Sequence, residues 1–102
     1  MEQQTDDYET MLRAYAAANP GEMLRPITTA EAAGPEVLNL GTPEALQKMR
    51  SRNKKLGLPV PPGFAFVPGL GWRYRSKLEL LLWAHEYYES RRRDPGAERS
   101  AA

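Results

Sequence analysis

Prolines, glycines and helix-capping side chains mark where the elements of this chain begin and end. Nine prolines and eight glycines are spread over 102 residues, so helices and strands have to fit between closely spaced breaks. Capping boxes open at Asp6, Thr28 and Ser76, each with a glutamate three residues later, and Thr42-Pro43-Glu44 forms a fourth helix start. We therefore predict four helices separated by turns.

The first helix is predicted to begin at Thr5 or Asp6 and to end at Asn19-Pro20-Gly21. It is acidic near its start and carries an apolar stripe at helical spacing. The stripe consists of Tyr8, Met11, Leu12, Tyr15 and Ala16. We expect this stripe to dock on the rest of the domain or on a second copy of the chain.

Two further helices with a glycine-containing turn between them have the proportions of a helix-turn-helix. The first is short, from Thr28 to Ala33, and the second extends over Thr42–Arg52. Gly34-Pro35 interrupts the first helix or marks a second start, and Gly41 supplies the tight turn. The core candidates of this region are Val37, Leu38, Leu40, Ala45, Leu46 and Met49.

A β-hairpin is predicted after this region. Residues 54–63 contain three prolines and are expected to form an extended connector rather than a helix. The runs Phe64–Val67 and Trp72–Arg75 are rich in strand-forming residues and flank the loop Pro68–Gly71.

Alternation along the strands assigns the hairpin side chains to two faces. We expect the aromatic side chains to face the core, namely Phe64, Phe66, Trp72 and Tyr74. The two arginines of the second strand then face solvent.

The last helix is predicted to start at the Ser76 cap and to end before Asp94-Pro95-Gly96, with a disordered tail behind it. Its first two turns are apolar on nearly every side, from Leu78 to Ala84, and include Trp83 as a core candidate. One face meets the core, and the N-terminal helix or a symmetric partner must cover the other.

Several classes of protein are excluded by composition. The chain has no cysteine and one histidine, so we expect no enzyme, no metal site and no cofactor. That histidine, His85, has Glu86 and Glu89 nearby in sequence, but adjacent helical residues point apart. No apolar run approaches the ~18 residues of a membrane span, and no secretory signal is visible, so we expect a cytoplasmic protein without membrane contact.

The net charge of +1 conceals a strong segregation of charge along the chain. Residues 1–40 carry seven acidic and two basic side chains, residues 41–77 one acidic and eight basic ones, and residues 78–102 five acidic and four basic ones. The excess positive charge thus lies within one segment, and this pattern indicates an anionic binding partner.

Four segments in this order resemble the MerR-like, excisionase-type winged helix-turn-helix family, which includes AlpA-like regulators. They are Ile27–Ala33, Leu40–Arg50, Leu58–Pro62 and Trp72–Trp83, the last containing Arg-Tyr-Arg-Ser-Lys-Leu-Glu. The resemblance implies a mainly α fold with a small β-hairpin, a winged helix-turn-helix with an added N-terminal helix. It also implies that helix 42–52 enters the major groove and that the wing, residues 64–75, touches the backbone or the minor groove.

The predicted DNA contacts follow from that resemblance and from the charges. They are Thr42, Gln47, Lys48, Arg50, Ser51, Arg52, Lys54, Lys55, Arg73 and Arg75. Because Gln47, Arg50 and Ser51 are one to four residues apart, we expect them to share a helix face that reads base edges. Lys54 and Lys55, on the expected connector, suit phosphates better.

The sequence therefore predicts a small DNA-binding protein, either a transcription regulator or a phage or plasmid recombination accessory factor. Its expected regions are 1–26, an acidic helix and linker; 27–93, the winged domain; and 94–102, the tail. A homodimer or side-by-side assembly on double-stranded DNA is expected. The alternative is a protein-interaction module that binds a partner through its N-terminal or last helix. In a further alternative, the acidic first helix masks Arg73 and Arg75.

Overall fold

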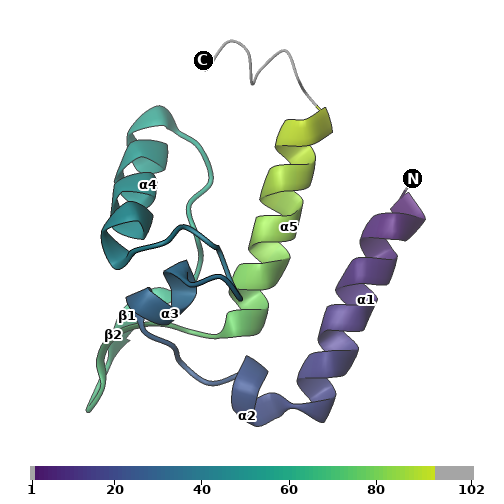
Figure 1. Ribbon diagram of the computed structural model, residues 1–102, viewed down its shortest axis with the longest axis horizontal. Coiled ribbons are helices and arrows are strands. Elements are labelled where there is room, and N and C mark those ends of the chain that lie inside the picture. Colours follow the sequence, from purple (N-terminus) through teal and green to yellow (C-terminus); the bar gives the residue numbers. More distant parts are fainter. Residues whose placement is uncertain (1, 94–102) are drawn as a thin grey trace.

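The computed structural model describes residues 2–93, with side-chain surroundings from Asp7 to Ser90. It is mainly helical with one two-stranded antiparallel hairpin (Figure 1). In chain order the elements are α1 (Glu2–Ala18), α2 (Pro20–Met23), α3 (Thr29–Ala33), α4 (Pro43–Leu56), β1 (Phe64–Val67), β2 (Gly71–Tyr74) and α5 (Lys77–Arg93). The expected tail at 94–102 lies outside the described residues.

Helix α1 begins at Glu2, earlier than the predicted start at Thr5 or Asp6. It ends at the predicted break, but the residues after Asn19 form the short helix α2 instead of a turn. Pro20 accounts for this helix because its fixed φ suits a first helical turn. The predicted apolar stripe is correct only in part, since Met11 is 66% exposed and Tyr15 is also exposed.

Helices α3 and α4 begin at their predicted caps. The Thr28 hydroxyl accepts a hydrogen bond from the Glu31 backbone N–H, and the Glu31 carboxylate accepts one from the Thr28 N–H. The Thr42 hydroxyl accepts from the Ala45 N–H in the same way. Between the two helices Gly41 has a φ of +96°, which confirms the predicted turn.

Helix α4 is longer than predicted and ends at Leu56, so Lys54 and Lys55 are helical and not part of a connector. The stop signal is Gly57, which adopts a left-handed conformation and donates its N–H to the Asn53 and Lys54 carbonyls. Pro59 restricts only the residue before it, and the negative end of the helix favours the two lysines. The prediction was wrong because it extended the effect of the prolines too far back.

The predicted hairpin is present, with a small shift in its second strand. Phe64 lies opposite Tyr74 and Val67 opposite Gly71, so β2 covers 71–74 rather than 72–75. Tyr74 also exchanges two backbone hydrogen bonds with Ile27, which attaches the segment before α3 to the edge of β2.

The prediction that all four hairpin aromatics face the core is wrong for two of them. Tyr74 is fully buried and Phe64 packs against the core, but Phe66 is 59% exposed and Trp72 is 58% exposed. All four rings do share one face, as alternation requires. The hairpin projects beyond the body of the molecule, so the core covers only the half of that face nearest α5 (Figure 1).

The core lies between α3, α4, β2 and the first half of α5. Its buried members are Ile27, Ala32, Ala33, Leu38, Leu46, Met49, Tyr74 and Leu80, with Val37, Leu40, Phe64, Trp83 and Ala84 packed around them. The predicted core candidates of the α3–α4 region are therefore confirmed, except that Ala45 is only half-buried.

Helix α1 covers a face of α5, as one of the two alternatives predicted. The two helices run side by side in opposite directions (Figure 1), and the rings of Tyr8 and His85 lie 4.2 Å apart. Leu12 and Leu81 line one hollow between them. No helix within residues 2–93 has the length and apolar character needed to cross a bilayer.

Candidate nucleic-acid interface

One exposed row of side chains on α4 brings together half of the predicted DNA contacts. It consists of Gln47, Lys48, Ser51, Arg52 and Lys55, spaced three and four residues apart. Together with Glu44 and Leu56 they line an open hollow of about 590 Å³. The buried residues Leu46, Met49 and Asn53 lie on the opposite side of the helix, so packing of the core turns this polar row outward.

Arg50 does not belong to that row, contrary to the expectation that it shares a face with Gln47 and Ser51. Its guanidinium carbon lies 4.4 Å from the centre of the Phe64 ring, in cation–π geometry. The Arg50 Nε is buried without a hydrogen-bond partner among the described residues. Arg50 therefore joins α4 to the hairpin.

Two predicted contacts lie near the ends of α4. Thr42 uses its hydroxyl to cap the helix, as described above, so its free hydrogen-bonding capacity is reduced. Lys54 is exposed in the last turn and does not line the hollow of the row. Both residues are held by a helix rather than by a flexible segment.

The two hairpin arginines lie apart from the α4 row. Arg73 projects from the hairpin face opposite the four aromatic rings, and its Nη1 donates to the Trp72 carbonyl at 2.9 Å. Arg75 forms two hydrogen bonds with the Glu79 carboxylate, at 3.0 and 3.1 Å. These bonds raise the pKa of Arg75 and pair its charge with that of Glu79.

The pairing between Arg75 and Glu79 also changes the predicted capping box of α5. The Ser76 hydroxyl accepts the Glu79 N–H, as predicted. The Glu79 side chain, however, turns to Arg75. Gly63 makes room for it, since a Cβ at that position would lie 2.6 Å from the Glu79 Oε1. Of the two hydrogen bonds of a capping box, α5 therefore has the one from the Glu79 N–H to the Ser76 hydroxyl, while the Glu79 side chain binds Arg75.

Lys77, which contributes to the basic segment, is held by two ion pairs within the fold. Its Nζ donates to Glu22 at 3.0 Å and to Glu36 at 3.3 Å, and its side chain is only 14% exposed. Burial by itself would lower the pKa of Lys77, but the hydrogen bonds to the two glutamates raise it. Lys77 is therefore structural.

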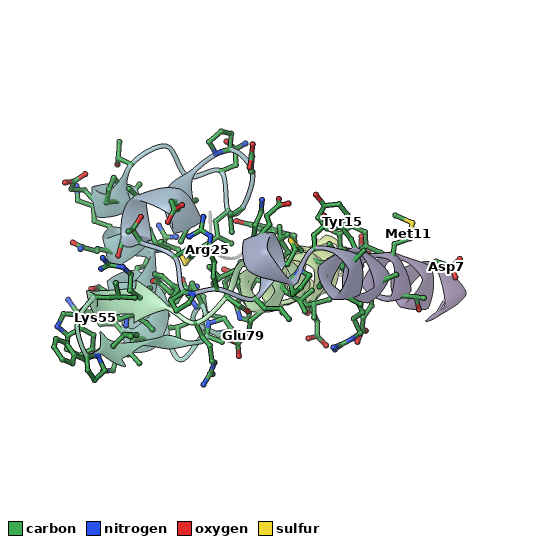
Figure 2. The ribbon with its side chains drawn as sticks, turned by 90° about the horizontal axis from the view of Figure 1, so that it is seen from below. Asp7, Met11, Tyr15, Arg25, Lys55 and Glu79 are labelled. Carbon is green, nitrogen blue, oxygen red and sulfur yellow. The ribbon has the colours of Figure 1, made fainter. Side chains whose placement is uncertain are left out.

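The acidic first helix lies far from the basic row. Figure 2 shows Asp7 at one end of the molecule and Lys55 at the other. Glu9 pairs with Arg13 within α1, at 2.8 Å. The partners described for Arg73 and Arg75 belong to the hairpin and α5, so the prediction that α1 masks these arginines is wrong for the described side chains.

Asn53 has a structural role that was not predicted from the sequence. It is 1% exposed, and its Nδ2 donates to the Pro59 carbonyl at 2.8 Å and to the Tyr87 hydroxyl at 3.3 Å. It thereby fixes the end of α4 to the connector and to α5. The detectable signal was its helical spacing of four and seven residues from Met49 and Leu46.

No protein family, curated protein or solved structure matches this chain. The candidate site therefore rests on the positions and chemistry of its own residues. Among the described residues, no three histidine, cysteine, aspartate or glutamate side chains are placed to bind a metal ion together. What the α4 row offers is three cations with an amide and a hydroxyl between them, a set suited to phosphates and base edges.

Proposed function

We propose that this chain is a sequence-specific, non-catalytic protein that binds double-stranded DNA. The observation that carries the proposal is the exposed row on α4, which is basic apart from Glu44 in the first turn of the helix. Residues 45–78 contain eight basic side chains and no acidic one. Lys48, Arg52 and Lys55 stand on one side of a helix, and no part of the described chain covers them.

The chemistry of the row matches the two kinds of contact that DNA recognition needs. Lysine and arginine neutralise phosphates and release counterions, which makes binding strongly salt-dependent. Gln47 and Ser51 lie between the cations and carry donors and acceptors that can pair with base edges. The major groove is wide enough to admit an α-helix, so α4 can present both sets together.

The proposal also assigns the fold to the winged helix-turn-helix type. In it α3 and α4, with the Gly41 turn between them, form a helix-turn-helix, and β1 and β2 form its wing. The capped start of α4 would face the duplex, and the wing would lie on the backbone or in the minor groove. The biological role would be that of a small transcription regulator or a recombination accessory factor.

A single α4 row reads only a few base pairs. We therefore propose that two copies bind as a homodimer or side by side on repeated sites.

Fluorescence anisotropy with a mixed-sequence 30-base-pair duplex, measured over a series of salt concentrations, tests the proposal. We expect Lys55→Ala to weaken binding and to reduce the salt slope by about one unit, because each phosphate contact releases about one counterion. Arg13→Ala is the matched control, since Arg13 is an exposed cation on α1. It should leave both quantities unchanged.

Undetectable binding at low salt would reject the proposal. Equal effects of Lys55→Ala and Arg13→Ala would also contradict it, because binding would then depend on total charge rather than on α4. Selection of bound sequences with Gln47→Ala adds a test of base reading, in which we expect a relaxed preference at one position.

A protein-interaction module is the second candidate, favoured by the outer face of α1. Met11 is exposed there, and Figure 2 shows its side chain directed away from the body of the molecule. This candidate predicts that Met11→Ala reduces capture of a protein partner from nuclease-treated lysate, while the wild-type chain shows no affinity for DNA.

A further inference from the structure

Two large aromatic side chains near the tip of the hairpin are only partly covered by the described chain. Phe66 and Trp72 are both more than half exposed, and their rings meet edge to face with centroids 5.8 Å apart. Leu70, in the loop between the strands, is 51% exposed as well. Exposed aromatic surface of this kind is unfavourable in water unless a partner covers it.

The exposed pair lies on the same side of the hairpin as α4. Trp72 stacks on Phe64 at 5.3 Å, and Phe64 in turn carries the Arg50 guanidinium from α4. Strand alternation places Ala65 and Arg73 on the other side. A molecule lying along α4 would therefore meet aromatic rings on the hairpin, and the two hairpin arginines would point away from it.

The charges around the pair favour a polyanion over a second copy of this chain. Residues 45–78, which supply α4 from its third residue onward, the connector and the hairpin, contain no acidic side chain, and Glu44 is the one acid of α4. A symmetric dimer through the aromatic face would bring two such cationic regions together, because the same patch meets itself across a two-fold axis. A duplex held on α4 brings negative charge to the same place.

We propose that Phe66 and Trp72 act as an apolar wedge that enters the minor groove beside the major-groove segment occupied by α4, and that the wedge bends the duplex. This inference rests on the proposed function and assigns the wing contact to the aromatic rings instead of to Arg73 and Arg75. Apolar side chains inserted at a base step partly unstack it and kink DNA. The tip of the hairpin projects from the body of the molecule (Figure 1).

A wedge binds more tightly to DNA that is already kinked, because the protein then does not supply the energy of unstacking. The test compares two 30-base-pair duplexes of the same sequence, one continuous and one with a two-adenine bulge at its centre, by anisotropy at low salt. We expect the wild-type chain to prefer the bulged duplex by about tenfold.

In the double variant Phe66→Ala, Trp72→Ala this preference should fall to about one, while affinity for the continuous duplex changes only slightly because the α4 row still binds it. Trp72→Phe should keep most of the preference. Met11→Ala, which removes an equally exposed apolar side chain from α1, is the control and should keep all of it. Circular dichroism and urea unfolding verify that each variant is folded.

Each outcome decides a different point. If neither duplex binds, the proposed function fails together with the wedge. Equal affinity of the wild-type chain for both duplexes, or a preference that survives the double substitution, overturns the wedge alone. If sedimentation shows a wild-type dimer that the double variant dissociates, while the preference for the bulge remains, the occupant of the aromatic face is a second copy and the wedge is rejected.

Discussion

At the scale of single residues, the structure separates side chains that bind the fold together from those that are free to bind something else. Asn53 and Arg50 lie on α4 beside the exposed row, yet both turn inward and connect α4 to other elements. Lys48 and Lys55 lie on the same helix and remain exposed. Whether a polar or charged residue of α4 is structural or exposed is therefore decided by its angular position on the helix and not by its residue type.

Asn53→Ala should destabilise the protein by about 1–3 kcal/mol, because it removes a buried donor from the Pro59 carbonyl and leaves a small cavity. Urea denaturation measures the change in the free energy of unfolding. Gln47→Ala, an exposed polar position on the same helix, is the control and should stay within about 0.5 kcal/mol of the wild type. If the two variants are equally stable, Asn53 is not the link that we describe.

At the scale of elements, one cluster of ion pairs and a hydrogen bond joins four parts of the chain. Lys77 at the start of α5 contacts Glu22 on α2 and Glu36 in the segment after α3, and the Tyr15 hydroxyl of α1 donates to Glu22 at 2.8 Å. Hydrogen bonds from Tyr15 and Lys77 lower the pKa of Glu22 below its ordinary value. The cluster therefore depends on an ionised Glu22.

A carboxylate with a lowered pKa stabilises the fold at neutral pH, and this contribution is lost as the pH falls through the folded-state pKa. We expect the melting temperature to decrease on acidification below the ordinary range of a glutamate, and Glu22→Gln to weaken this decrease. Thermal unfolding followed over a pH series measures the effect. Glu86→Gln makes the same chemical change at an exposed position outside the cluster and should leave the pH profile as it is in the wild type.

At the scale of the whole molecule, α5 separates two surfaces. Helix α1 covers one side of α5, and α3, α4 and the hairpin occupy the other (Figure 1). The exposed α4 row and the outer face of α1 are therefore far apart and can be altered independently. This separation makes the proposed DNA surface and any surface on α1 testable one at a time.

Leu12→Asp should loosen α1 from α5, because it places a charge in the hollow that Leu12 shares with Leu81. We expect a loss of about 1–3 kcal/mol in the free energy of unfolding and an unchanged salt slope of DNA binding. Ala14→Asp puts the same charge on an exposed position of α1 and is the control. A changed slope in Leu12→Asp alone would show that α1 supports the α4 surface after all.

The caps of α3 and α4 and the hairpin were predictable because they depend on interactions between residues close in sequence, whereas the predicted cap at Asp6 lies inside α1. Thr28 with Glu31, Thr42 with Ala45, and the pairing of β1 with β2 involve only local hydrogen bonds and turn geometry. The basic character of α4 was equally visible, since charge is a property of the residues themselves.

Only the tertiary structure decided how far the core extends and which way individual side chains turn. Strand alternation placed four aromatic rings on one face, but it did not show that the core covers Tyr74 and leaves Trp72 in solvent. Helical spacing likewise did not reveal that Arg50 turns to Phe64 or that Lys77 is held by two glutamates distant in sequence. These outcomes depend on how elements far apart in the chain fill space against one another, and a local pattern does not specify that.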